Sequence, residues 1–577
     1  MTRGALRLAA LAAVAAAAAL GSARVSRTDT PDPPAPALAP PPGARDATAD
    51  TAPATPAASG AAGATAAPDA LPIAAPTAPP ASAPSAAPRA RGAQLLLAGK
   101  GDEAAAAYAE ALAADPGDEL AMEGRVRALI DSGRWTEALA DARRFAAAKP
   151  RSAPAASALG AALLRAGRIP EASAALTPLA ATEKPPARAL MTLGLVRVAE
   201  GNEDEGAGLL DRALALAPED RDVIRESAGA AQTRAEAVAR LTRYLDRSAG
   251  DDPDRIEGAK GTIRTYKALG ERRVWVRVSR PDHVEVPLAS VRNPNGSLAG
   301  LSVELAAPPG KPIRVLLDTG STGLFLVERI AAKAGLSPLA EETTFGGGGE
   351  GRHANKTGLL ARVAIGDLRF TDALVTTTTQ EIEPTGRYHG VLGLSIFQGY
   401  RVTIDLAREK LILELPVSAA AGSAAAGSAS GADAPSASPA PPPSPAGSPY
   451  WSVESQMLVE AATADGRSGL FLFDTGATAS LLSLDFADAA KAWIGGQTNA
   501  RGYGGVLRDA REVRGVKLRF QGLETNGAPM TASDLSQRSR LGGVEVSGYL
   551  GLDLLARTLV TVDTTSRRVA VTRPGKR

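Results

Sequence analysis

The sequence contains the same eight-residue pattern twice, at 315–322 and at 471–478, so the two copies are 156 residues apart. Each copy is an apolar run that ends in aspartate and continues with threonine and glycine. Such a run predicts a buried strand that turns sharply at its end. An aspartate there is poorly hydrated, so its charged form is disfavoured, and two such groups close together cannot both ionise. The repeat therefore predicts two similar domains whose aspartates, Asp318 and Asp474, can share one proton.

Two carboxyl groups that share a proton can carry out acid–base chemistry together. The ionised member acts as a base on a water molecule, and the protonated member acts as an acid on a carbonyl group. Gly320 and Gly476 permit the tight turn that brings backbone N–H groups towards each carboxylate. The hydroxyl groups of Thr319 and Thr475 can brace one loop against the other.

The flanking sequence is repeated as well, so the duplication extends beyond the aspartate motif. A Gly-x-Leu-Gly-Leu segment follows each motif, and its second glycine, Gly393 or Gly551, lies 75 or 77 residues after the aspartate. A strand-like segment ends 12 residues beyond each of these glycines, at Asp405 and Asp563. A glycine-rich segment lies between motif and late glycine in each half, at 345–351 and 502–505. The two halves therefore predict one duplicated domain.

This set of spaced motifs resembles the aspartic proteases, and the short halves resemble the retropepsin-like branch of that family. The resemblance covers roughly residues 285–415 and 450–575. It implies two all-β acid-protease domains, Asp318 and Asp474 as catalytic carboxylates, a polypeptide substrate and no cofactor. The residues that it implies for support of the active-site loops are Thr319, Gly320, Thr475, Gly476, Gly393 and Gly551. Those that it implies for two flaps over the substrate are Phe345, Gly346, Gly347, Gly348, Tyr503 and Gly504.

The first 88 residues predict an exported protein. Residues 1–23 have the outline of a secretory signal peptide, with two arginines, an alanine-rich apolar run and a small-residue end. The apolar run is shorter than the roughly 20 residues that a membrane span needs, and retention as an anchor is the alternative. We expect a periplasmic or extracellular location, with no membrane span after signal cleavage. Residues 24–88 are mostly Ala, Pro, Thr and Ser, which predicts a disordered linker.

Residues 89–270 predict a helical-repeat domain. Glycines recur every 34 residues at 99, 133, 167 and 201, and alanines at 104, 138 and 172 keep the same step. This period resembles the tetratricopeptide repeats, which are stacked helical hairpins. The concave face of such a stack often binds an extended peptide, so a protein partner on the repeats is one possibility. An inert spacer or assembly scaffold is the other.

The rest of the chain divides into a first β-domain at 271–416, a flexible Ala/Gly/Ser/Pro linker at 417–448 and a second β-domain at 449–577. A linker of that length spans roughly 30 Å, which favours pairing of the β-domains within one chain. Pairing of each domain with its copy in another chain is the alternative. The net charge of +2 predicts no nucleic-acid partner, and three scattered histidines with no cysteine predict no metal site.

Together these features predict an exported aspartic endopeptidase with an N-terminal tetratricopeptide-like domain. The alternative in a different class is a non-catalytic peptide-binding scaffold of the cell envelope, in which the duplicated domains keep the fold without activity.

Overall fold

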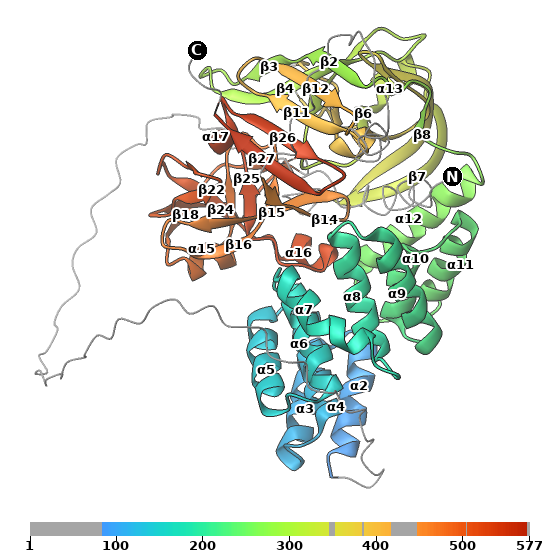
Figure 1. The fold of residues 1–577 in the computed structure, drawn as a ribbon, viewed down its shortest axis with the longest axis vertical. Coiled ribbons are helices and arrows are strands. Elements are labelled where there is room, and N and C mark those ends of the chain that lie inside the picture. Colours follow the sequence, from blue (N-terminus) through green and yellow to red (C-terminus); the bar gives the residue numbers. More distant parts are fainter. Residues whose placement is uncertain (1–83, 346–351, 384–385, 417–446, 503–504, 574–577) are drawn as a thin grey trace, which may run out of the picture.

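The computed structural model describes residues 84–345, 352–383, 386–416, 447–502 and 505–573. The predicted signal peptide, most of the predicted linkers and the predicted flap residues Gly346, Gly347, Gly348, Tyr503 and Gly504 lie outside these ranges. Two β-domains lie together at one end of the molecule, and a helical domain lies against both of them (Figure 1).

The helical domain is a stack of antiparallel hairpins whose even-numbered helices form the inner wall, since α2, α4, α6, α8 and α10 contact one another in turn. A glycine with positive φ ends the first helix of four successive hairpins, Gly99, Gly133, Gly167 and Gly201, which explains the 34-residue period. The helices are α2 Ala86–Leu97, α3 Gly101–Ala114, α4 Glu119–Asp131, α5 Trp135–Ala148, α6 Ala153–Arg165, α7 Ile169–Ala180, α8 Ala187–Ala199, α9 Glu203–Leu216, α10 Arg221–Ala228, α11 Arg234–Leu245 and α12 Pro253–Leu269.

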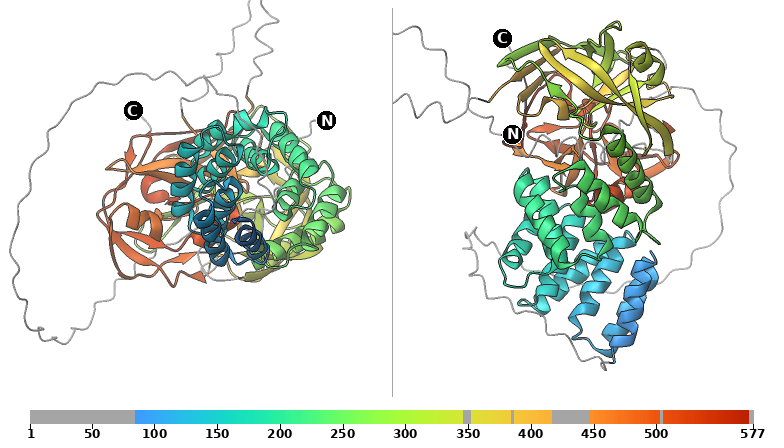
Figure 2. Two further views of the ribbon diagram at one scale, coloured as in Figure 1. Left: turned by 90° about the horizontal axis from the view of Figure 1, so that it is seen from below. Right: turned by 90° about the vertical axis from the view of Figure 1, so that its right-hand side faces the viewer.

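The helical stack curves until its first turn touches the loop before its last helix (Figure 2). A Cβ atom on Gly99 would lie 1.9 Å from the carbonyl oxygen of Gly250, so the two backbones are in direct contact. The Arg221 guanidinium closes the same junction, because it donates to the carbonyl oxygens of Leu97 at 3.3 Å and Ala249 at 3.4 Å. The inner helices therefore surround a central channel.

The first β-domain is built on a sheet with the order β3-β4-β5-β10-β6-β9-β8-β7, with β1 added at β9. Its elements are β1 Val276–Arg277, β2 His283–Pro287, β3 Ala289–Arg292, β4 Leu298–Leu305, β5 Ile313–Leu317, β6 Leu324–Val327, α13 Glu328–Lys333, β7 Ser337–Phe345, β8 Arg352–Ile365, β9 Leu368–Thr378, β10 Gly390–Leu392, η1 Leu394–Phe397, β11 Arg401–Asp405 and β12 Lys410–Glu414.

The second β-domain repeats this topology, with β14 and β15 leading to β16-β25-β17-β24-β21-β18, and with β22 and β23 added at β15. Its elements are β13 Ser448–Pro449, β14 Trp451–Val453, β15 Gln456–Thr463, β16 Ser468–Phe473, β17 Leu481–Ser483, α15 Leu484–Ala489, β18 Trp493–Gln497, β19 Arg501–Gly502, β20 Gly505–Val506, β21 Arg511–Arg514, β22 Leu518–Phe520, β23 Leu523–Glu524, β24 Met530–Ser533, α16 Ser536–Gly542, β25 Gly548–Leu550, α17 Leu552–Leu555, β26 Leu559–Asp563 and β27 Arg568–Thr572.

The two β-domains share a third sheet, in which β2, β12 and β11 continue into β26, β27 and β13. Strands β11 and β26 are antiparallel, and Thr403 faces Thr561 at the centre with their hydroxyl oxygens 3.3 Å apart. Three strands from each half thus meet about an approximate twofold axis. The described structure therefore pairs the two halves within one chain.

The helical domain is joined to the β-domains by a buried core and by ion pairs such as Arg165–Glu545, at 2.9 Å. A single buried apolar cluster contains Leu190 and Leu193 of α8 together with Leu472 and Tyr549 of the second β-domain.

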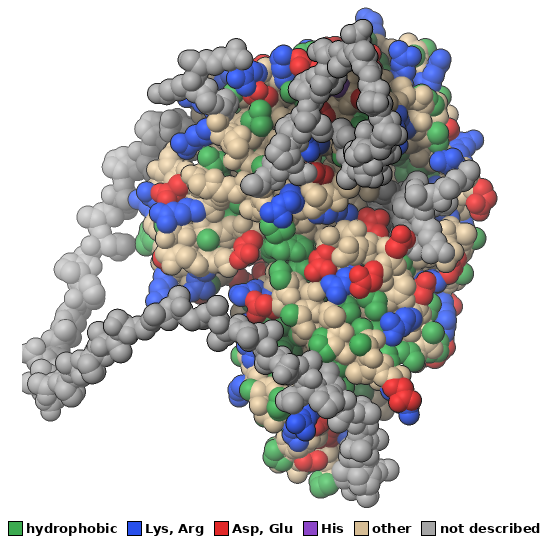
Figure 3. All heavy atoms as spheres, viewed as in Figure 1, with side chains coloured by type: hydrophobic (Ala, Val, Ile, Leu, Met, Phe, Trp, Pro, Cys, Tyr) green, Lys and Arg blue, Asp and Glu red, His purple; other side chains and the backbone are tan. Residues whose placement is uncertain are grey.

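Lys and Arg side chains are mixed with Asp and Glu over the face seen in Figure 3. No described helix is long and apolar enough to cross a membrane.

Candidate active site

Two equivalent pairs of parallel strands place the predicted aspartates. Asp318 follows β5, which pairs with β10, and the Asp318 N–H donates to the carbonyl oxygen of Leu392 at 3.0 Å. Asp474 follows β16, which pairs with β25, and its N–H donates to the carbonyl oxygen of Leu550 at 3.0 Å. The repeated Gly-x-Leu-Gly segments are therefore the strands that hold the aspartate strands in place.

The threonines after the aspartates bind the two loops to each other with reciprocal hydrogen bonds. Thr319 N–H donates to Thr475 Oγ1 at 3.1 Å, and Thr475 N–H donates to Thr319 Oγ1 at 3.0 Å. Each hydroxyl also donates across the interface, from Thr319 to the carbonyl oxygen of Phe473 at 2.6 Å and from Thr475 to that of Leu317 at 3.0 Å. Four buried hydrogen bonds thus fix the separation and orientation of the loops.

The two carboxyl groups face each other across this interface, and glycine is required beside each of them. A Cβ atom on Gly320 would lie 2.7 Å from Cγ of Asp474, and one on Gly476 would lie 2.6 Å from Cγ of Asp318. No other residue fits at either position without displacing the opposite carboxylate.

Both carboxyl groups are buried, with Asp318 1% and Asp474 0% exposed. Burial raises the pKa of Asp318 above its ordinary value. Burial raises the pKa of Asp474 further, because the negative charge of Asp318 adds to the desolvation. Backbone N–H groups favour the charged forms in part, with Gly320 donating to Asp318 Oδ1 at 2.7 Å and Gly476 donating to Asp474 Oδ1 at 2.8 Å.

Asp474 Oδ2 is buried and accepts no hydrogen bond from an N–H or hydroxyl donor among the described residues. The side chain in hydrogen-bonding contact with the Asp474 carboxyl is that of Asp318. Because a carboxylate cannot donate, that contact is satisfied only when one of the two groups is protonated. The geometry therefore favours a pair that shares one proton.

Gly393 and Gly551 lie directly behind the aspartate loops. A Cβ atom on Gly393 would lie 2.2 Å from the carbonyl oxygen of Ser321, and one on Gly551 would lie 2.5 Å from the carbonyl carbon of Ala479. Both late glycines thus allow close backbone contact with the loop that follows the aspartate.

Sequence reasoning missed two further supports, Ser395 and Asp553, each two residues after a late glycine. Ser395 Oγ accepts from the N–H of Gly323 at 3.0 Å, and Asp553 Oδ1 accepts from both the N–H and the hydroxyl of Ser480 at 2.8 and 2.7 Å. The sequence signal that could have found them is position. When the two halves are aligned on Gly393 and Gly551, Ser395 and Asp553 fall at the same place.

The predicted first flap begins at the end of β7, where the backbone of Phe345 pairs with that of Arg352 in the hairpin β7–β8. Helix α12 packs along this hairpin. Thr265 of α12 donates to Glu342 of β7, and Arg264 Nε donates to the carbonyl oxygen of Glu341 at 2.8 Å. The second predicted flap coincides in part with the short hairpin β19–β20. Sequence reasoning gave no indication that the helical domain contacts a flap.

No group of three or more His, Asp or Glu side chains in the described part of the chain is placed to bind a metal ion. The buried acids of the site are the two aspartates, which face each other and two glycines. The arrangement thus offers acid–base chemistry by a carboxyl pair.

Comparison with known protein families gives one match in each β-domain. Residues 303–396 and 460–554 each match the family described as aspartyl protease. Both β-domains match the aspartyl protease family. The match confirms the resemblance that the motifs predicted and the β-domain part of the predicted fold class. The two matched segments contain Asp318 and Asp474 at equivalent places.

Among solved structures, a thermophilic TPR protein of Thermus thermophilus is 24% identical and covers 31% of this chain and 99% of its own, with a TM-score of 0.26. The type IV pilus biogenesis factor PilW is 22% identical and covers 33% of this chain and 93% of its own, with a TM-score of 0.24. No curated relative matches the chain in sequence.

Proposed function

We propose that this protein is an aspartic endopeptidase in which Asp318 and Asp474 together activate a water molecule to hydrolyse a peptide bond. The observation that carries the proposal is the buried, face-to-face carboxyl pair held by four reciprocal threonine hydrogen bonds. A scaffold protein has no need for two desolvated acids in contact, because such a pair is unfavourable unless a proton is shared.

The roles of the two acids follow from their surroundings. The negative charge of Asp318 helps to raise the pKa of Asp474, so we assign the shared proton to Asp474 and the role of the base that takes a proton from the attacking water to Asp318. Asp474 holds the shared proton and donates it to the carbonyl oxygen of the substrate, giving a tetrahedral intermediate. Collapse of this intermediate breaks the C–N bond as the proton taken by Asp318 passes to the leaving nitrogen and a hydroxyl proton of the intermediate returns to Asp474. The threonine bridges keep the two carboxyl groups in register throughout.

The substrate is an extended polypeptide that lies between the carboxyl pair and the hairpin β7–β8. The described strands of this hairpin, which lead into the predicted first flap, offer their backbone to the substrate, which pairs with it as an added strand. No cofactor takes part. Residues 1–23 direct export to the periplasm or the extracellular space, and the helical domain contributes to recognition of a protein partner or substrate.

The test is cleavage of a random peptide library and of a reduced, alkylated protein, followed by mass spectrometry between pH 3 and pH 8. Asp318→Asn is the matched control, because it keeps the shape of the side chain and removes the acid. We expect cleavage by the native protein and none by the variant. A native protein that binds these peptides without cutting them would support the peptide-binding scaffold instead.

A further inference from the structure

Three cavities lie between the inside of the helical stack and the loop that follows Asp318. The repeat channel, about 510 Å³, lies inside the curved stack and is lined by residues of α4, α6, α8 and α10. The junction cavity, about 260 Å³, lies between α8–α12 and the segments 452–454 and 541–544 of the second β-domain. The cleft-end cavity, about 110 Å³, reaches Thr319 and Ser321 on either side of Gly320.

Neighbouring cavities share wall residues, so they adjoin one another. The repeat channel and the junction cavity share Leu195, Arg225 and Arg255, among others. The junction cavity and the cleft-end cavity share Val198 and Glu454. The three cavities thus lie side by side, from the inside of the helical stack to Ser321, which is three residues after Asp318 in the sequence.

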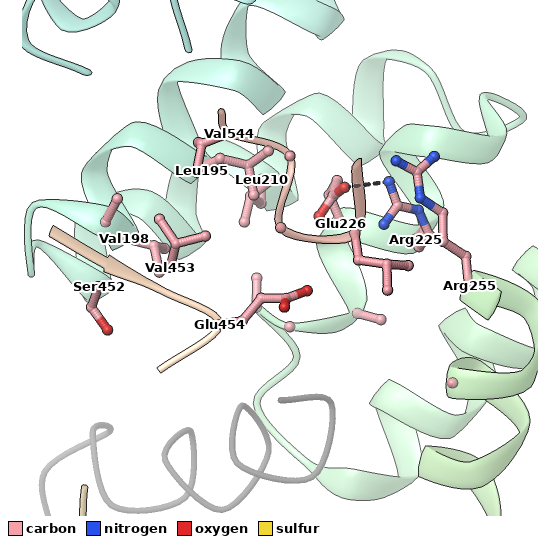
Figure 4. Close-up of a pocket in the computed structure, with 18 of the residues that line it drawn as sticks. Leu195, Val198, Leu210, Arg225, Glu226, Arg255, Ser452, Val453, Glu454 and Val544 are labelled. Atoms are coloured by element: carbon pink, nitrogen blue, oxygen red, sulfur yellow. Dashed lines mark ion pairs between the residues drawn. The ribbon is translucent and has the colours of Figure 1, made fainter. Parts of the chain in front are cut away.

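The walls of the junction cavity are mainly apolar. Figure 4 shows Leu195, Val198 and Leu210 of the helical domain on one side and Val453 of the second β-domain beside Val198. The Arg225–Glu226 ion pair, at 2.6 Å, borders the far end towards the repeat channel. A pocket of this size and lining suits a large apolar side chain.

Three polar groups along these cavities lack partners among the described residues. Ser321 Oγ and Gln456 Oε1 are buried without a hydrogen bond, although Gln456 Nε2 donates to the carbonyl oxygen of Gly320 at 2.7 Å. The Glu454 carboxylate points into the junction cavity (Figure 4) and forms no ion pair, and burial raises its pKa. A polypeptide backbone supplies N–H and C=O groups at regular spacing, which matches acceptors and a hydroxyl spread along a narrow path.

We infer that the junction cavity and the cleft-end cavity form an extended subsite for the part of the polypeptide substrate that continues beyond the cleaved bond on one side. The inference rests on the proposed function. The helical domain supplies one wall of this subsite, so it selects substrates by an apolar residue several positions from the cut. The junction cavity takes that residue, and the backbone of the same segment bonds to Ser321, Gln456 and Glu454.

The native protein provides the first test. A six-residue peptide around a cleavage site found in the library is compared with two longer peptides, one extended by six apolar-rich residues at its N-terminus and one at its C-terminus. We expect kcat/KM to rise about tenfold for extension on one side only, which is the effect of burying one large apolar side chain. Equal values for all three peptides would overturn the inference.

A variant pair provides the second test. Val198→Trp fills the place where the two cavities meet, and Leu216→Trp adds the same ring at an exposed position, 55% accessible, on the neighbouring helix α9. The ratio of kcat/KM for the extended peptide to kcat/KM for the six-residue peptide should fall to about 1 in Val198→Trp and stay at about 10 in Leu216→Trp. A full gain in a folded Val198→Trp protein would overturn the inference.

Binding separates this inference from the proposed function. Fluorescence anisotropy with the labelled longer peptide measures affinity for the native protein without any need for cleavage. Tenfold tighter binding than the short peptide, with no cleavage of either, would refute the endopeptidase and keep the subsite. Cleavage of both peptides with no dependence of affinity on length would refute the subsite and keep the endopeptidase.

Discussion

Glu342 makes the contact between the helical domain and the first flap hairpin sensitive to pH. The side chain is 6% exposed and accepts a hydrogen bond from Thr265 of α12. Burial raises its pKa from 4.5 to about 7. The pKa of Glu342 is higher in the folded protein than in the unfolded chain. The contribution of this carboxyl group to folding stability is therefore fully present below pH 4.5 and is lost as the pH rises through about 7.

The size of this effect follows from the pKa shift. A shift of one pKa unit corresponds to 1.36 kcal/mol, so the rise from 4.5 to about 7 amounts to about 3 kcal/mol between acidic and alkaline conditions. We expect Glu342→Gln to remove this dependence, because the amide keeps the shape and the acceptor oxygen and has no charge. Below pH 4.5 the variant and the native protein should be equally stable at this contact.

Hydrogen exchange with mass spectrometry measures the opening free energy of strands β7 and β8 directly. The native protein should lose up to about 3 kcal/mol of protection from pH 5 to pH 8 relative to Glu342→Gln at each pH. Glu341→Gln is the matched control, because the neighbouring side chain is exposed, and it should follow the native protein. The same pH profile in native protein and Glu342→Gln, or better protection of the native hairpin at pH 8, would refute this explanation.

Three further predictions concern the interfaces and the carboxyl pair. Thr475→Val should destabilise the β-domains by about 3 kcal/mol in urea denaturation, because it leaves the Thr319 N–H and the Leu317 carbonyl without the Thr475 hydroxyl. Thr475→Ser keeps the hydroxyl and should stay close to native. Equal loss of stability in both variants would exclude the hydroxyl as the cause. Arg165→Met should destabilise the folded protein by about 3 kcal/mol, because it leaves the Glu545 carboxylate buried without the guanidinium that donates to it at 2.9 Å. Adding Glu545→Gln removes the buried charge and should restore most of the lost stability. No recovery in the double variant would refute the charge argument. Peptidase activity should follow a bell-shaped pH profile with its optimum below neutral, and activity that keeps rising above pH 7 would contradict a shared proton.

The carboxyl pair and the threonines and glycines that support it could be predicted from the sequence, because they belong to short motifs that occur in both halves. Asp318 and Asp474 each begin an Asp-Thr-Gly motif after an apolar run, and the late glycines Gly393 and Gly551 keep nearly the same distance from them. Duplicated spacing of this kind implies the same strand order in both halves, and the structure pairs β5 with β10 in the first half and β16 with β25 in the second. The 34-residue glycine period predicted the helical hairpins in the same way.

The contacts between domains could not be predicted from the sequence. Thr265 and Glu342 are 77 residues apart, and Arg165 and Glu545 are 380 apart, and neither pair belongs to a repeated pattern. The shared sheet also depends on the antiparallel register of β11 with β26. The local alternation of apolar residues in each strand does not determine which strand of the other half it pairs with. For the same reason, the junction cavity, whose walls come from both domains, has no sequence signature.

Single substitution of each aspartate tests the central claim most directly. Peptide turnover is measured for Asp318→Asn, for Asp474→Asn and for an equimolar mixture of the two folded proteins. If the two carboxyl groups form one site within one chain, each variant loses essentially all turnover, because neither acid has another partner with which to share the proton, and the mixture stays inactive. Native-like turnover in either folded variant, or recovery of activity on mixing, would contradict a single active site formed by the two β-domains of one chain.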